Sequence, residues 1–119
     1  MRVNIGSGYK RIDGFVNVDD DPLVEPDYLL NIEKDKLPFP DNSVEEIRAH
    51  HILEHVGDGF IPLMQELYRV AKHGCLLDIL VPHHQHDNFY GDPTHKRPIT
   101  VATMYMFRSE EHTSELQSH

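Results

Sequence analysis

The sequence has a single cysteine, no long apolar run and no leader-like N-terminus. Cys75 cannot form an internal disulfide, and no second sulfur lies near it to bind a metal, so we expect it to be a small buried hydrophobic residue. No stretch of about 18 apolar residues is present, and the basic-then-apolar pattern of a secretory signal is missing. These absences exclude a disulfide scaffold and a membrane-spanning helix, and they predict a cytoplasmic protein.

Positive charge is also scarce. The chain of 119 residues has 11 lysines and arginines against 20 acidic residues, a formal net charge of −9. The electrostatic field of such an acidic protein repels nucleic-acid phosphates and anionic membranes, so neither is a favoured partner. A cationic small molecule is attracted by the same field. With 39% hydrophobic and 26% charged residues, the composition suits one small globular domain.

The end of the chain differs in character from the rest. Residues 108–119, RSEEHTSELQSH, resemble the translation of a common sequencing-library adapter. We therefore expect these residues to be an artefactual or disordered tail and exclude them from the reasoning about the fold. Residues 1–107 are then the natural domain, and we expect this domain to be truncated at its C-terminal end.

Short apolar runs alternate with polar connections along residues 1–107. A longer apolar run, CLLDILVP, lies at residues 75–82 and is too apolar for a half-exposed strand. The segment LPFPDNS is rich in turn-forming residues and predicts a loop. We expect this apolar run to be a fifth strand, preceded by strands at Arg2–Ile5, Phe15–Val18, Tyr28–Ile32 and Val44–Ala49.

One helix is predicted between the fourth and fifth strands. From Gly59 to His73, apolar residues recur at spacings of three and four, which is typical of a helix with one buried face. Gly74 is placed to end this helix, after basic residues that suit its C-terminus. Strands, connections and a helix in this order predict an α/β domain with a mostly parallel sheet.

Two glycines and an acidic residue suggest a ligand site near the N-terminus. Gly6 and Gly8 follow the first strand, where backbone can approach a ligand closely, and Asp19 ends the second strand. A nicotinamide dinucleotide is disfavoured, because the eleven residues from Gly8 to Asp19 hold at most a turn of helix to bind a pyrophosphate. A carboxylate in this position can accept hydrogen bonds from two ribose hydroxyls.

Five segments in order resemble a known family. NIGSG, GFVNVDDDP, LPFPDNSVEEIRAHHILEHV, ELYRVAKHGCLLDILVP and DPTHKRPIT are together similar to the class I S-adenosylmethionine-dependent methyltransferases, in particular a small branch with a shortened first helix. The resemblance covers nearly all of residues 1–107. It implies a Rossmann-like, doubly wound, mostly parallel sheet, of which this chain would hold about five of seven strands.

The resemblance also implies a set of binding residues for S-adenosylmethionine. The methionine part of the cofactor would lie along the backbone of the glycine turn, the ribose would bind the acidic residues after the second strand, and the adenine would lie near the third. Two histidines that end the fourth strand would face the sulfonium. The implied residues are Gly6, Ser7, Gly8, Asp19, Asp20, Asn31, Ile32, His50 and His51.

The implied reaction is transfer of a methyl group to an acceptor that the sequence does not identify. If the acceptor is an amine or a hydroxyl, a base must take its proton, and histidine suits neutral pH. His51, His83 and His84 are the candidates, because strands four and five end there. Beyond the fifth strand, His95 is a substrate-side candidate in a small basic cluster that allows an anionic acceptor.

Two other functions are open alternatives. HILEH, from His51 to His55, matches the HxxEH pattern of zinc hydrolases, with His83, His84, His86 or Asp87 as the third ligand. The other alternative is a nucleoside-binding module without activity. If the last two strands of the family are missing, the fifth strand becomes an edge, and we expect a poorly stable and inactive fragment.

Overall fold

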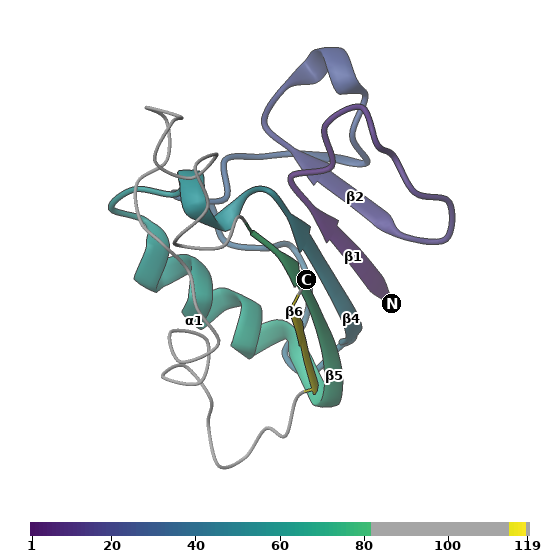
Figure 1. Ribbon diagram of the computed structural model, residues 1–119, viewed down its shortest axis with the longest axis vertical. Coiled ribbons are helices and arrows are strands. Elements are labelled where there is room, and N and C mark those ends of the chain that lie inside the picture. Colours follow the sequence, from purple (N-terminus) through teal and green to yellow (C-terminus); the bar gives the residue numbers. More distant parts are fainter. Residues whose placement is uncertain (82–114, 119) are drawn as a thin grey trace.

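The structure, a computed structural model, describes residues 1–81 and 115–118. Six parallel-paired strands form one sheet in the order β3-β2-β1-β4-β5-β6, the order of a doubly wound α/β fold. One α-helix lies against one face of this sheet (Figure 1). The elements are β1 Arg2–Ile5, β2 Val16–Asp19, the 3-10 turn η1 Pro22–Val24, β3 Tyr28–Leu29, β4 Val44–His50, the 3-10 turn η2 Leu53–His55, α1 Phe60–Val70, β5 Ala71–Leu80 and β6 Glu115–Ser118.

The predicted fold class is confirmed, with differences at the element ends. β1 has the predicted bounds, whereas β2 begins and ends one residue later than expected. β3 stops at Leu29, because Asn31 folds the chain into a turn: its side-chain oxygen accepts the N–H of Glu33 and its carbonyl accepts the N–H of Asp35. Leu30 and Ile32, which were expected to extend this strand, instead lie beyond its end and line a cavity described below.

The helix ends earlier than its apolar pattern predicts. α1 stops at Val70, and Gly74 does not terminate it. The carbonyls of Arg69 and Val70 accept the N–H groups of Asn42 and Ser43, so pairing with the segment before β4 begins at the last helical turn. Gly74 instead takes a φ of 80° in an exposed bulge of β5, a conformation that favours glycine.

The core lies between α1 and one face of the sheet. The helix contributes five buried side chains, and the sheet contributes alternate residues of each central strand. Cys75 is 1% exposed in this core, as expected, and burial raises the pKa of its thiol to about 11, so it stays protonated. The principal core residues are Val3, Ile5, Val18, Ile47, Ala49, Phe60, Leu63, Met64, Leu67, Val70, Leu77 and Ile79.

The opposite face of the sheet carries a polar row. Asn17, Asn4, Arg48 and Asp78 are register partners on the four adjacent strands β2, β1, β4 and β5. The two asparagines hydrogen-bond to each other at 3.0 Å and, together, to the backbone of Lys10, Ile12 and Phe15. These amides thus hold the short connection between β1 and β2 in the place where a doubly wound fold usually has a helix.

The long connection between β3 and β4 is tied to α1 by one arginine. The guanidinium of Arg69 donates to the carbonyls of Leu37 and Phe39 at 3.0 Å. It also bonds the carboxylates of Glu66 and Asp41 at distances of 2.7 to 2.9 Å. These bonds hold the turn-rich segment LPFPDNS against the C-terminal end of α1.

β5 is not an edge strand. Glu115–Ser118 forms β6 and pairs with Leu76–Ile79 of β5 in parallel register, which provides partners for the outer backbone groups of β5. The expected edge at the fifth strand is therefore wrong for this structure. The assignment of residues 108–119 to an artefact stays a prediction. No helix in the described part of the chain is long and apolar enough to cross a membrane.

Candidate functional site

The glycine turn after β1 is held against the end of β2 by its own backbone. The N–H groups of Gly6 and Ser7 both donate to the carbonyl of Val18, at 2.9 and 3.1 Å. The N–H of Gly8 donates to Oδ2 of Asp19 at 2.8 Å. Gly6 and Gly8 have φ values of 66° and 53°, so both use the left-handed backbone that favours glycine.

This arrangement leaves no free backbone N–H group at residues 6–8 to bind an anion. A phosphate-binding loop presents several free N–H groups, but here three successive ones already have acceptors. The carboxylates of Asp19 and Asp20 line the same cavity as Gly6 and repel a pyrophosphate there. That a nicotinamide dinucleotide is disfavoured stays a prediction.

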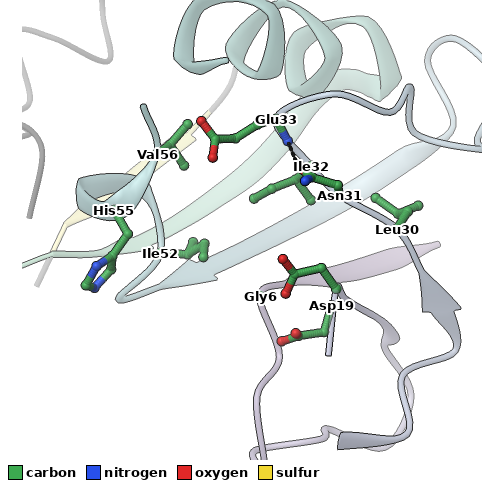
Figure 2. A pocket seen from close by; sticks show the side chains of 10 residues that line it. Gly6, Asp19, Leu30, Asn31, Ile32, Glu33, Ile52, His55 and Val56 are labelled. Carbon is green, nitrogen blue, oxygen red and sulfur yellow. Dashed lines mark hydrogen bonds between the residues drawn. The ribbon is translucent and has the colours of Figure 1, made fainter. Parts of the chain in front are cut away.

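A cavity of about 210 Å³ opens beside this turn, between the ends of β1, β2 and β4. In Figure 2, Ile32 and Ile52 project into it from opposite sides, with Asp19 near Gly6 below them. The walls are apolar in the middle and acidic at the rim, which suits a flat group with hydroxyls attached. Its lining residues are Gly6, Asp19, Asp20, Leu30, Asn31, Ile32, Glu33, Ile52, His55 and Val56.

One wall of this cavity is fixed by Glu33. Its Oε1 accepts the N–H of Gly57 at 2.7 Å and that of Gly59 at 3.4 Å, so the carboxylate holds the loop that enters α1. A Cβ on Gly59 would lie 2.5 Å from the backbone oxygen of Glu33, which no side chain allows. The backbones at Gly59 and Glu33 therefore approach so closely that position 59 has room for a hydrogen atom but not for a side chain.

A second cavity, a groove of about 390 Å³, lies on the other side of Gly6. The floor comes from β4 and β5, and the wall comes from the connection that follows β1. Ser7 lines it and is only 6% exposed, and its buried hydroxyl has no hydrogen-bond partner. The groove residues are Asn4, Gly6, Ser7, Gly8, Tyr9, Lys10, Arg48, His50, His51 and Leu80.

The nine residues expected to bind the cofactor are thus divided between two cavities that meet at Gly6. Five of them line the smaller cavity and five the groove, with Gly6 in both. Glu33, Ile52, His55 and Arg48 also line these cavities but were not among the nine, and His55 was considered only as a zinc ligand. Ile52 and His55 come shortly after the end of β4, so their position at a strand's carboxyl end was the available signal. Nothing local in the sequence singles out Glu33.

The histidines after β4 have different surroundings. Nε2 of His50 lies 3.1 Å from Oδ1 of Asp78. His51 has a φ of 57°, an uncommon conformation for a residue with a side chain, and its Nδ1 lies 4.0 Å from Oε2 of Glu54. Glu54 is 1% exposed, and neither of its side-chain oxygens has a hydrogen-bond partner.

The HxxEH pattern does not form a zinc-hydrolase geometry here. His51 and His55 lie on no common α-helix, and they line different cavities, His51 the groove and His55 the smaller one. Among residues 1–81 and 115–118, no three possible metal ligands come together. The expected third ligands and the base candidates His83 and His84 fall outside the described residues, as does His95.

Comparison with known proteins gives a structural likeness without a sequence match. No family model matches the chain, and no curated protein does. The structure is similar to a SAM-dependent methyltransferase from Archaeoglobus fulgidus, with a TM-score of 0.72 and 21% identity over 88% of this chain and 57% of that one. It is also similar to the YcgJ protein from Bacillus subtilis, with a TM-score of 0.60 and 21% identity over 88% of this chain and 58% of that one.

The chain therefore spans less than two thirds of the length of these two structures. At 21% identity, these likenesses show that the chain shares the fold of the two structures and nothing more specific. From the strand order and this likeness, the chain has a Rossmann-like, doubly wound fold, which it shares with these two structures.

Proposed function

We propose that the chain binds S-adenosylmethionine across the two cavities that meet at Gly6 and transfers its methyl group to an acceptor in the groove. The observation that carries the proposal is the hydrogen bond from the Gly8 N–H to Asp19, which brings the glycine turn and the acidic strand end to one site. Together the cavities fall within the range of about 300–1,000 Å³ typical of small-molecule sites.

The smaller cavity is suited to the adenosine part. Ile32 and Ile52 offer apolar surface for the base, and Asn31 lies beside them. Asp20 has no hydrogen bond or ion pair in the described part of the chain, so its carboxylate is available for a ribose hydroxyl. Asp19 already accepts N–H groups from Gly8 and Asp21, and its remaining lone pairs can take the second hydroxyl.

Charge supports the same ligand. Adenosine carries no phosphate, and the acidic side chains of the smaller cavity repel a nucleotide polyphosphate. The turn has no free N–H group at residues 6–8 to bind phosphate. The bound cofactor would supply the electrophilic methyl group, and the protein would align the acceptor with it, which lowers the barrier by orientation.

His51 is our candidate for the group that takes the acceptor's proton. Among the three histidines considered, it is the one in the described part of the chain, and it lines the groove. The Glu54 carboxylate lies behind it, with Oε2 4.0 Å from Nδ1 of His51. His50, at the next position of the same groove, would contact the sulfonium side of the cofactor.

Calorimetry with purified chain tests the proposal. We expect S-adenosylmethionine and S-adenosylhomocysteine to bind at one site, and NAD to bind at least about a hundredfold more weakly because the backbone N–H groups of residues 6–8 already have acceptors. Absence of binding by both sulfur nucleosides, or equal binding of NAD, overturns it. A methyl-transfer assay then separates an enzyme from a binding module.

A further inference from the structure

The two cavities that meet at Gly6 have opposite charge. Three acidic side chains and one histidine line the smaller cavity, whereas the groove is lined by Lys10, Arg48, His50 and His51 and by no acidic residue. In a chain with a formal net charge of −9, this is a local exception. We propose that the groove binds a methyl acceptor that carries an anionic oxygen group, a carboxylate or a phosphate; this inference rests on the proposed function.

The cations of the groove are not fully neutralised by neighbours. The carboxylate of Asp78 lies 3.7 Å from Nη1 of Arg48 and 3.1 Å from Nε2 of His50. It is not among the residues that line the groove, and its side chain is 15% exposed; as the register partner of Arg48 on the next strand it lies beside that arginine in the polar row. The ammonium of Lys10 has no ion pair in the described part of the chain. Two permanent positive charges thus face one negative charge.

An uncharged donor lies among these cations. Ser7 lines the groove, its buried hydroxyl has no hydrogen-bond partner, and leaving such a group unpaired costs free energy. An anionic oxygen in the groove would accept from this hydroxyl and from the Arg48 guanidinium. The orphaned hydroxyl is an observation independent of the charge, and it indicates a ligand at the same place.

The groove exists because the connection after β1 is short. The polar row on this face of the sheet puts Arg48 level with Asn4, and the asparagine holds the connection to one side. No helix in the described residues covers β4 and β5 on this face (Figure 1). An acceptor can therefore reach the sheet itself beside Gly6, the residue that both cavities share.

Titration of simple anions into the chain, followed by amide NMR, tests the inference. The protein is saturated with S-adenosylhomocysteine, and inorganic phosphate or acetate is added, with tetramethylammonium as the cationic control. We expect saturable shifts at Ser7, Lys10 and Arg48 with at least one anion and none with the cation. Arg48→Gln and Lys10→Gln should each weaken the anion about tenfold. Arg2→Gln, on the same face outside the groove, should leave it unchanged.

The outcomes separate the two proposals. Absence of groove shifts with both anions, or shifts that survive Arg48→Gln and Lys10→Gln, overturns the inference. It is also overturned if Arg48→Gln weakens S-adenosylhomocysteine but not methylthioadenosine, because the groove then holds the cofactor's own carboxylate. The titration is repeated without nucleoside. If anions bind there but no sulfur nucleoside does, the proposed function fails while the anion site stands.

Discussion

The backbone N–H of Gly8 donates a 2.8 Å hydrogen bond to the carboxylate of Asp19, eleven residues further along the chain. The other oxygen of Asp19 accepts the N–H of Asp21 at 2.9 Å. One side chain therefore fixes the glycine turn and the exit from β2 at the same time. Asp20, directly beside it, is exposed and has no such structural role.

This difference predicts that two neighbouring aspartates respond differently to the same substitution. Asp20→Asn should weaken S-adenosylmethionine about tenfold without changing stability, because only a ligand contact is lost. Asp19→Asn should weaken binding and also lower the free energy of unfolding by about 1–2 kcal/mol, since an amide cannot accept both N–H groups. Calorimetry and urea unfolding measure the two effects. Unchanged affinity in both variants would remove the aspartates from the site.

Alanine at the two turn glycines should have unequal effects. Both residues have positive φ, so either substitution costs about 1–2 kcal/mol of unfolding free energy. At Gly6 a Cβ would also meet Cγ1 of Ile52 at 2.9 Å, whereas at Gly8 it meets nothing within 4 Å. We expect Gly6→Ala to cost about 3 kcal/mol in total and to weaken S-adenosylmethionine more than Gly8→Ala. Equal stability and affinity of the two variants would contradict this.

We expect the buried carboxylate of Glu54 to lower the free energy of unfolding of the wild-type protein. A buried carboxylate without a hydrogen bond is costly, and methionine has a similar shape without the charge. We expect Glu54→Met to raise the free energy of unfolding by about 1–3 kcal/mol in urea. Glu45→Met, whose side chain is 56% exposed in the wild type, is the control and should change it by less than about 0.5 kcal/mol. A destabilised Glu54→Met protein would mean that the carboxylate has a stabilising partner.

Arg69 should not be replaceable by lysine. Its planar guanidinium bonds two carbonyls and two carboxylates at once, a geometry that an ammonium cannot reproduce. We expect Arg69→Lys to lower the free energy of unfolding by about 2 kcal/mol. Arg11→Lys, at an exposed pair with Asp27, should cost less than about 1 kcal/mol. Comparable losses from thermal or urea unfolding would contradict the role of Arg69.

Acid should weaken the same network. Hydrogen bonds from Arg69 hold the pKa of Glu66 below its ordinary value, with a further contribution from the N–H of Leu37. A lowered folded-state pKa stabilises the protein above the unfolded-state pKa, and this stability is lost as pH falls through the folded-state value. The urea midpoint of the wild type should therefore fall in acid, and Glu66→Gln should flatten that part of the profile. Parallel profiles for the two proteins would exclude this contribution.

The sequence was sufficient for the order of elements from β1 to β5, because that order depends on local apolar patterns. Periodicity predicted the strand at Arg2–Ile5, all but the last residue of β4, and the buried face of α1. It did not predict β6, which lies in the segment expected to be a tail. The end of α1 was predicted wrongly, because the backbone of Asn42 and Ser43 takes its last carbonyls, and a contact 27 residues away along the chain leaves no local signal.

The candidate site was predicted in part for a similar reason. Residues at the carboxyl ends of strands could be found, since a parallel sheet brings those ends together. Glu33 and Arg48 could not, because Glu33 depends on a close approach to Gly59 and Arg48 on the row that crosses the sheet. Neither relationship is a property of the residues next to them in the chain.

The side-chain amides of Asn4 and Asn17 are satisfied by the short connection between β1 and β2, so they require that connection to stay short. Grafting a long amphipathic helix between β1 and β2 would lay hydrocarbon over two carboxamides and a guanidinium, and it would remove the main-chain partners that satisfy the amides. Swapping the crossover for a longer one should therefore yield insoluble protein unless Asn4, Asn17 and Arg48 are made apolar together.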